Sequence, residues 1–156
     1  MRAAEEARAV AAVRSLFAAL DVGDFDGARL RLAPTVELDY VGLWGGAPRR
    51  LAAEDLVQGW RDAISGFDAV RHDLGAPRPA VGGSSALVVC PAEILHLLDD
   101  RDWRLTGVYR LGLVRASPWR VASIVFELER ETGDRDLVDR ARRRARARRR
   151  VTPDQA

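Results

Sequence analysis

The chain has 156 residues, 47% of them hydrophobic, which is enough for one domain with a real core and too little for two. No stretch approaches the roughly 18 apolar residues that span a bilayer, so we expect no membrane partner. Glu5 and Glu6 stand where a secretory signal peptide would carry only positive charge. The single cysteine, Cys90, excludes an internal disulfide framework, and we expect a cytoplasmic location.

The basic residues are distributed unevenly. All 25 are arginine, which is typical of a GC-rich genome and weakens arginine as a sign of function. Within a net charge of +2, residues 131–156 carry +4 and residues 1–130 carry −2. The basic segment contains no aromatic residue on which a base could stack. We therefore do not expect nucleic acid to be a partner.

Three helices are predicted in the first half of the chain. Apolar residues at steps of three or four predict an amphipathic helix over 3–20. Gly23 suits the end of that helix, and Asp24 suits the N-cap of a short second helix over 25–32. The same periodicity predicts a third helix over 52–65.

Strands follow the helices. Alternating apolar and polar residues predict strands over 36–40 and 70–74. Three longer strands, over 85–98, 104–115 and 119–129, have connections short enough for antiparallel hairpins. Helices first and a meander last favour an α+β fold over a parallel α/β fold. We predict a cone-shaped, curved, mixed or antiparallel sheet wrapped around three N-terminal helices, with a deep pocket between them.

Few residues in this plan could carry chemistry. His72 and His96 both fall on apolar strand faces, where a histidine is more often a satisfied core residue than a catalyst. Asp21 ends the first helix, where a turn residue is the ordinary interpretation, and Tyr40 shares the apolar face of its strand. Neither a metal-ligand spacing, a glycine-rich phosphate loop nor a nucleophile elbow is visible, so we expect no metal.

The order and spacing of four stretches resemble scytalone dehydratase and, more broadly, the SnoaL-like branch of the nuclear transport factor 2 fold. These stretches are ALDVGDFD (19–26), APTVELDY (33–40), LAAEDLV (51–57) and VRHDL (70–74). The resemblance runs from about residue 5 to residue 130. It implies a SnoaL-like α+β domain over 1–130, followed by an Arg-rich C-terminal helix or flexible arm over 131–156.

The resemblance also implies roles for individual residues. Asp21 matches the aspartate that hydrogen-bonds the catalytic histidine, and His72 matches that histidine, the general base and acid. Tyr40 matches a tyrosine that helps to polarise the substrate carbonyl. His96 falls near the second pocket histidine of the family, and Thr106 falls where the dehydratase has a pocket serine.

Two departures from the family pattern predict a more apolar pocket. Leu20 stands in place of a second pocket tyrosine, and Val108 stands in place of an asparagine. With Trp44, Trp60 and Phe126, these residues complete the predicted substrate-binding set. The substrate is therefore expected to differ from scytalone.

The implied function is a cofactor-free acid–base enzyme, a dehydratase, isomerase or cyclase, acting on a small apolar carbonyl metabolite, with polyketide-type compounds as the expected class. The alternative is a non-catalytic member of the same fold that binds a ligand or a protein. A hydrogen bond between Asp21 and His72 beside a cavity would favour the enzyme. Apolar residues on the outer strand face, such as Leu87, Val89, Leu95 and Leu97, predict a homo-oligomer, a dimer or a trimer.

Overall fold

The computed structural model describes residues 1–151. Its helices are α1 (Arg2–Asp21), α2 (Phe25–Leu30), α3 (Val41–Trp44), α4 (Ala53–Ile64) and α5 (Leu137–Val151). Its strands are β1 (Leu32–Asp39), β2 (Arg49–Ala52), β3 (Ala69–Leu74), β4 (Arg78–Gly82), β5 (Ser85–Leu98), β6 (Arg101–Val114) and β7 (Arg120–Gly133). The predicted α+β class is confirmed. None of the helices within residues 1–151 is both long and apolar enough to cross a membrane.

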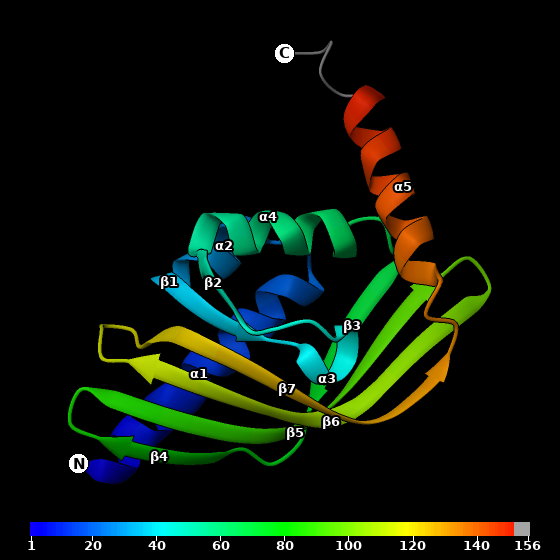
Figure 1. Cartoon of the computed structure of the whole chain (residues 1–156). Helices are drawn as coiled ribbons and strands as arrows, with labels where there is room; N and C mark the ends of the chain where they lie inside the picture. Colours follow the sequence, from blue (N-terminus) through cyan, green and yellow to red (C-terminus); the bar gives the residue numbers. More distant parts are fainter. Residues whose placement is uncertain (152–156) are drawn as a thin grey trace.

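All seven strands belong to one curved, mixed sheet that bends around α1 (Figure 1). The strand order is β2-β1-β7-β6-β5-β3, and β4 pairs with the first part of β5. Among the described strands β1 runs parallel to β7, and the other pairs are antiparallel. The register of β6 against β7 shifts next to Gly107, where an added Cβ would lie 2.2 Å from the carbonyl oxygen of Glu127. Only glycine permits this approach, and such bulges bend a sheet.

Helix α1 supplies the centre of the core. Its buried residues recur every three or four positions and face the concave side of the sheet. Gly23 follows its end with φ +73°, and the Asp24 side chain accepts a 2.9 Å hydrogen bond from the Gly27 N–H at the start of α2. The predicted boundary between the first two helices is therefore confirmed. The buried residues of α1 are Ala9, Ala12, Val13, Leu16, Phe17 and Leu20.

Three short elements were not predicted. Helix α3 and strand β2 occupy only four residues each, too few for a period to be visible. Strand β4, with the sequence RPAVG, has the composition of a turn and becomes a strand because β5 pairs with it. Strand β1 also begins at Leu32, where the prediction had the second helix still continuing.

The Arg-rich segment forms helix α5, which packs against the rest of the domain. Arg140 forms an ion pair with Asp99 at 3.3 Å, and Arg144 forms one with Asp68 at 2.8 Å. Gly66 makes room for the helix, since a Cβ there would lie 1.8 Å from the Ala141 carbonyl oxygen. Strand β7 continues to Gly133, past the boundary expected at 130, and residues 152–156 of the predicted segment lie outside the described residues. The buried face of α5 consists of Leu137, Val138, Ala141 and Ala145.

Candidate active site

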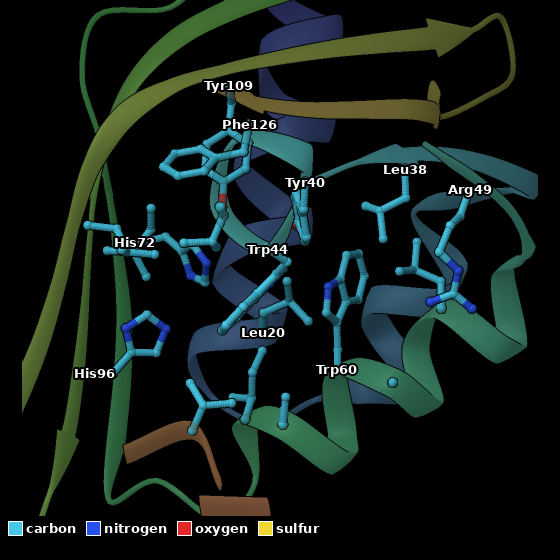
Figure 2. A pocket seen from close by; sticks show the side chains of 18 of the residues that line it. Leu20, Leu38, Tyr40, Trp44, Arg49, Trp60, His72, His96, Tyr109 and Phe126 are labelled. Atoms are coloured by element: carbon cyan, nitrogen blue, oxygen red, sulfur yellow. The ribbon is translucent and has the colours of Figure 1, made fainter. Parts of the chain in front are cut away.

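A cavity of about 590 Å³ lies between the concave face of the sheet and the helices (Figure 2). Its walls are mainly apolar and aromatic, and Trp44, Trp60 and Trp103 all contribute to them. The polar side chains of the interior are those of Tyr40, His72, His96 and Tyr109, while charged side chains line it from β2, α4 and α5. This composition suits an apolar molecule oriented by a few hydrogen bonds.

Asp21 and His72 form the most closely connected polar pair at the cavity: His72 lines it, and Asp21, which does not, contacts the His72 ring. Asp21 is the last residue of α1, and its carboxylate lies 2.6 Å from Nδ1 of His72. The same carboxylate also accepts the backbone N–H of His72, at 3.1 and 3.0 Å from its two oxygens. Because β3 is an edge strand, this N–H points away from β5 and is free to bind Asp21. One carboxylate thereby holds both the ring and the backbone of His72.

The geometry determines which ring nitrogen of His72 is available. A carboxylate only accepts hydrogen bonds, so Nδ1 carries a proton, and in the neutral ring Nε2 holds the lone pair. The ring lies on the cavity wall, 4.9 Å from the Phe17 ring between centroids, and the side chain is 7% exposed. A basic nitrogen inside an apolar cavity, backed by a carboxylate, can accept a proton from a bound molecule.

Tyr40 lies in the same cavity as a hydrogen-bond donor (Figure 2). It shares the inner face of the sheet with Leu38, as the alternation of its strand predicted. Burial raises the pKa of Tyr40 to about 12, so its hydroxyl keeps its proton at neutral pH. The indole of Trp60 and the hydroxyl of Tyr109 partly offset this effect of burial on the pKa of Tyr40. The protonated hydroxyl of Tyr40 can donate a hydrogen bond to an acceptor in the cavity.

Sequence reasoning missed Tyr109. Its side chain is buried, it lines the cavity, and burial raises its pKa well above the ordinary value. The alternation of β6 was the signal that could have found it, because Trp103, Leu105 and Leu111 have the same parity and are buried. Tyr109 therefore supplies a second phenol to the cavity, although Leu20 occupies the position that matches the second pocket tyrosine of scytalone dehydratase.

His96 lines the same cavity and stays neutral. Its Nδ1 lies 3.1 Å from the backbone carbonyl oxygen of Trp103, and its ring stacks on the Trp103 indole at 4.3 Å. A carbonyl oxygen accepts, so Nδ1 carries the proton and Nε2 is an acceptor. Burial lowers the pKa of His96 to about 4, which leaves the ring uncharged at neutral pH.

The remaining predicted residues divide into two groups. Leu20, Trp44, Trp60 and Phe126 line the cavity together with Tyr40, His72, His96 and Tyr109. Thr106 and Val108 do not line it, and their assignment to the pocket is wrong. They alternate with the buried residues of β6 and therefore face the outer side of the sheet.

The described part of the chain offers no metal centre of the usual kind. Within residues 1–151, no group of three or more His, Cys, Asp or Glu side chains could hold a metal ion. What the site offers is one basic nitrogen backed by a carboxylate, a neutral acceptor at His96 and a phenol donor at Tyr40. Such a set can move protons on a bound molecule.

Several solved structures have a fold similar to that of this chain. No family model and no curated protein sequence matches the chain. A solved structure, the Kfla4162 protein from Kribbella flavida, is similar with a TM-score of 0.80 at 17% identity, over 88% of this chain and 97% of that one. A candidate scytalone dehydratase from Novosphingobium aromaticivorans follows with a TM-score of 0.73 at 13% identity, over 84% and 88%.

A candidate dehydratase of the NTF2-like family from Streptomyces avermitilis has a TM-score of 0.70 at 15% identity, over 81% of this chain and 97% of that one. Each alignment covers most of both chains, so the whole domain is compared rather than a fragment. At such low identities the similarity establishes the fold, and the chemistry has to be argued from the side chains.

Proposed function

From the premise that the chain has the nuclear transport factor 2 fold, we propose that it is an acid–base enzyme that needs no cofactor and acts on an apolar carbonyl compound. The observation that carries the proposal is the 2.6 Å contact between Asp21 and Nδ1 of His72 on the wall of the cavity. It prepares Nε2 of His72 as a base where a substrate would lie.

The reaction begins with proton abstraction from the carbon next to the substrate carbonyl. Nε2 of His72 takes that proton, and the carboxylate of Asp21 stabilises the imidazolium that forms. The electron pair of the broken C–H bond moves toward the carbonyl oxygen, where the Tyr40 hydroxyl donates a hydrogen bond to the developing enolate. A positioned base of this kind typically contributes about 10²–10⁴-fold in rate.

The imidazolium can complete more than one reaction. If the substrate carries a β-hydroxyl, the proton passes to that oxygen, the C–O bond breaks and water leaves with formation of a C=C bond. If the proton returns to a different carbon, the product is a double-bond isomer. Attack of the enolate on a second carbonyl closes a ring. We favour dehydration, because two of the structural neighbours carry dehydratase names.

The cavity also suggests the size of the substrate. A volume of about 590 Å³ falls within the roughly 300–1,000 Å³ of typical small-molecule sites. Aromatic walls with few polar groups favour a planar, largely apolar body, as in polyketide-type aromatic ketones.

Deuterium exchange tests the step that all three reactions share. A panel of aryl ketones, such as 1-tetralone, is incubated with the protein in D₂O, and deuterium uptake at the α-carbon is followed by NMR. We expect exchange with the wild type to be faster than with His72→Ala by at least about 100-fold. Exchange that is equal for both proteins, with ketones that bind, would favour the non-catalytic binding protein.

The outer face of the sheet supports a proposal about assembly. Leu87 and Leu97 are exposed there, at 43% and 37%, and a second copy of the chain would cover them. We therefore propose a homodimer or homotrimer. Sedimentation equilibrium is expected to give a multiple of the 17.2 kDa chain mass, and a lower mass for Leu97→Glu. A wild type that sediments as a monomer contradicts this proposal.

A further inference from the structure

Arg142 is a charged side chain at the cavity for which the described residues provide no counter-charge. It projects from α5 and lines the cavity. Several other arginines of α5 are paired: Arg140 with Asp99, Arg144 with Asp68 and Arg149 with Asp62. Within residues 1–151 no ion pair or hydrogen bond includes the guanidinium of Arg142.

The position of Arg142 is determined by the rest of α5. Val138, one turn earlier, is buried and also lines the cavity, so residues 138 and 142 share one side of the helix. The close approach of Ala141 to Gly66 and the ion pairs on both sides hold that helix against the domain. Arg142 is thus presented to the cavity by a fixed element rather than by a loop.

The cavity is electrostatically uneven around this residue. Its other charged lining residues, Arg49 and Asp55, come from β2 and the first turn of α4, and Figure 2 shows Arg49 far from His96. The end of α4, against which α5 packs, contributes Ala63 and Ile64 to the lining, neither of which is charged. An anionic group that enters beside α5 therefore meets a guanidinium and no lining carboxylate.

We propose that Arg142 binds a carboxylate carried by the substrate, at the α5 side of the cavity. This inference rests on the proposed function, since the substrate is the one that His72 deprotonates. A guanidinium offers two parallel N–H donors that match the two oxygens of a carboxylate. Arg142 is solvent-exposed, so the carboxylate keeps part of its hydration while the apolar body lies against the aromatic walls. The substrate class is then an apolar keto acid.

Binding of a matched pair of probes tests this assignment. 2-Naphthoate and 2-naphthamide have nearly the same shape and differ in charge, and their dissociation constants are measured by isothermal titration calorimetry. With the wild type we expect 2-naphthoate to bind about 10-fold more tightly than 2-naphthamide. Arg142→Gln is expected to abolish that preference and Arg142→Lys to keep part of it. The control Arg143→Gln, an exposed neighbour on α5, is expected to leave it unchanged.

Several outcomes overturn the proposal. They are the absence of a preference for 2-naphthoate in the wild type, a preference that survives Arg142→Gln, and an equal loss of affinity for both probes. A preference removed by Arg49→Gln instead would place the anion at the other end of the cavity, which also contradicts it. The assay measures binding alone, so it is repeated with His72→Gln. The His72→Gln variant is expected to keep the preference for 2-naphthoate, because Arg142 is unchanged in it. If the wild type fails the exchange test but the preference is intact, the chemistry is refuted. If the wild type passes the exchange test but shows no preference, only the role of Arg142 is refuted.

Discussion

Replacing Asp21 with asparagine separates the positioning of His72 from its basicity. The carboxylate makes one hydrogen bond to the imidazole and two to the backbone N–H of the same residue. The asparagine amide keeps one oxygen for these donors but loses the negative charge that stabilises the imidazolium. Its NH₂ group can also face Nδ1, which would place the ring proton on Nε2 and remove the base from the cavity.

The size of the effect follows from these two losses. A hydrogen bond to a charged group contributes about 1.5–3 kcal/mol, so losing the charge alone predicts a rate loss of about 10–100-fold. Misplacing the ring proton would raise the loss toward about 10⁴-fold, the upper range for a general base. We therefore expect α-carbon exchange by Asp21→Asn to be at least 10-fold slower than by the wild type.

The assay is the deuterium exchange described above, with two controls. Asp24→Asn makes the same change three residues away, where asparagine still caps α2, and is expected to retain wild-type exchange. In a His72→Ala background, Asp21→Asn should have little further effect, because both residues act through the same nitrogen. A folded Asp21→Asn protein with wild-type exchange, or an additive effect in the double variant, would refute the reasoning.

Three further predictions concern Tyr109, His96 and Gly66. Tyr109→Phe removes a hydroxyl that interacts with Tyr40, so we expect about 10-fold slower exchange with unchanged ketone binding; an unaffected rate would show that Tyr40 acts without this hydroxyl. The pKa of His96 is about 4 in the folded chain against 6.5 ordinarily, so the unfolded chain binds more protons between these values and stability falls as the pH drops from about 6.5 toward 4. Over this window, the free energy of unfolding measured with urea should fall by about 3 kcal/mol more in the wild type than in His96→Gln. Equal decreases in the two proteins would contradict a neutral, buried His96 ring. Gly66→Ala should lower the free energy of unfolding by about 1–3 kcal/mol, because its Cβ meets the Ala141 carbonyl, while Gly59→Ala, with open space around it, should not; equal effects would refute the close packing of α5.

Local patterns predicted much of the fold. The stripe of α1 and the boundary at Gly23 and Asp24 follow from helix periodicity and capping, which are properties of neighbouring residues. Strand alternation likewise placed His72, His96 and Tyr40 on inward faces. These predictions succeeded because each depends on interactions within one element.

The candidate site required more than local pattern. Asp21 and His72 are 51 positions apart, and the resemblance to a known family, rather than periodicity, predicted their contact. The same resemblance put Thr106 and Val108 in the pocket, whereas the alternation of β6 turns both to the outer face. In a strand, a shift of one residue is enough to turn a side chain to the other face. The alternation of β6 itself was the better guide, and it leads to Tyr109.

Helix α5 shows most clearly what only the tertiary structure decided. Its sequence by itself predicted a basic helix or a flexible arm, since arginines surround the few apolar residues. The folded domain supplies what the segment lacks: a core surface for Leu137 and Val138, and carboxylates from Asp68 and Asp99 for its charges. Amino-acid sequence therefore determined which elements could form and which faces were apolar. The packing of distant elements decided where α5 docks and which side chains share the cavity, because those contacts join residues that no local period connects.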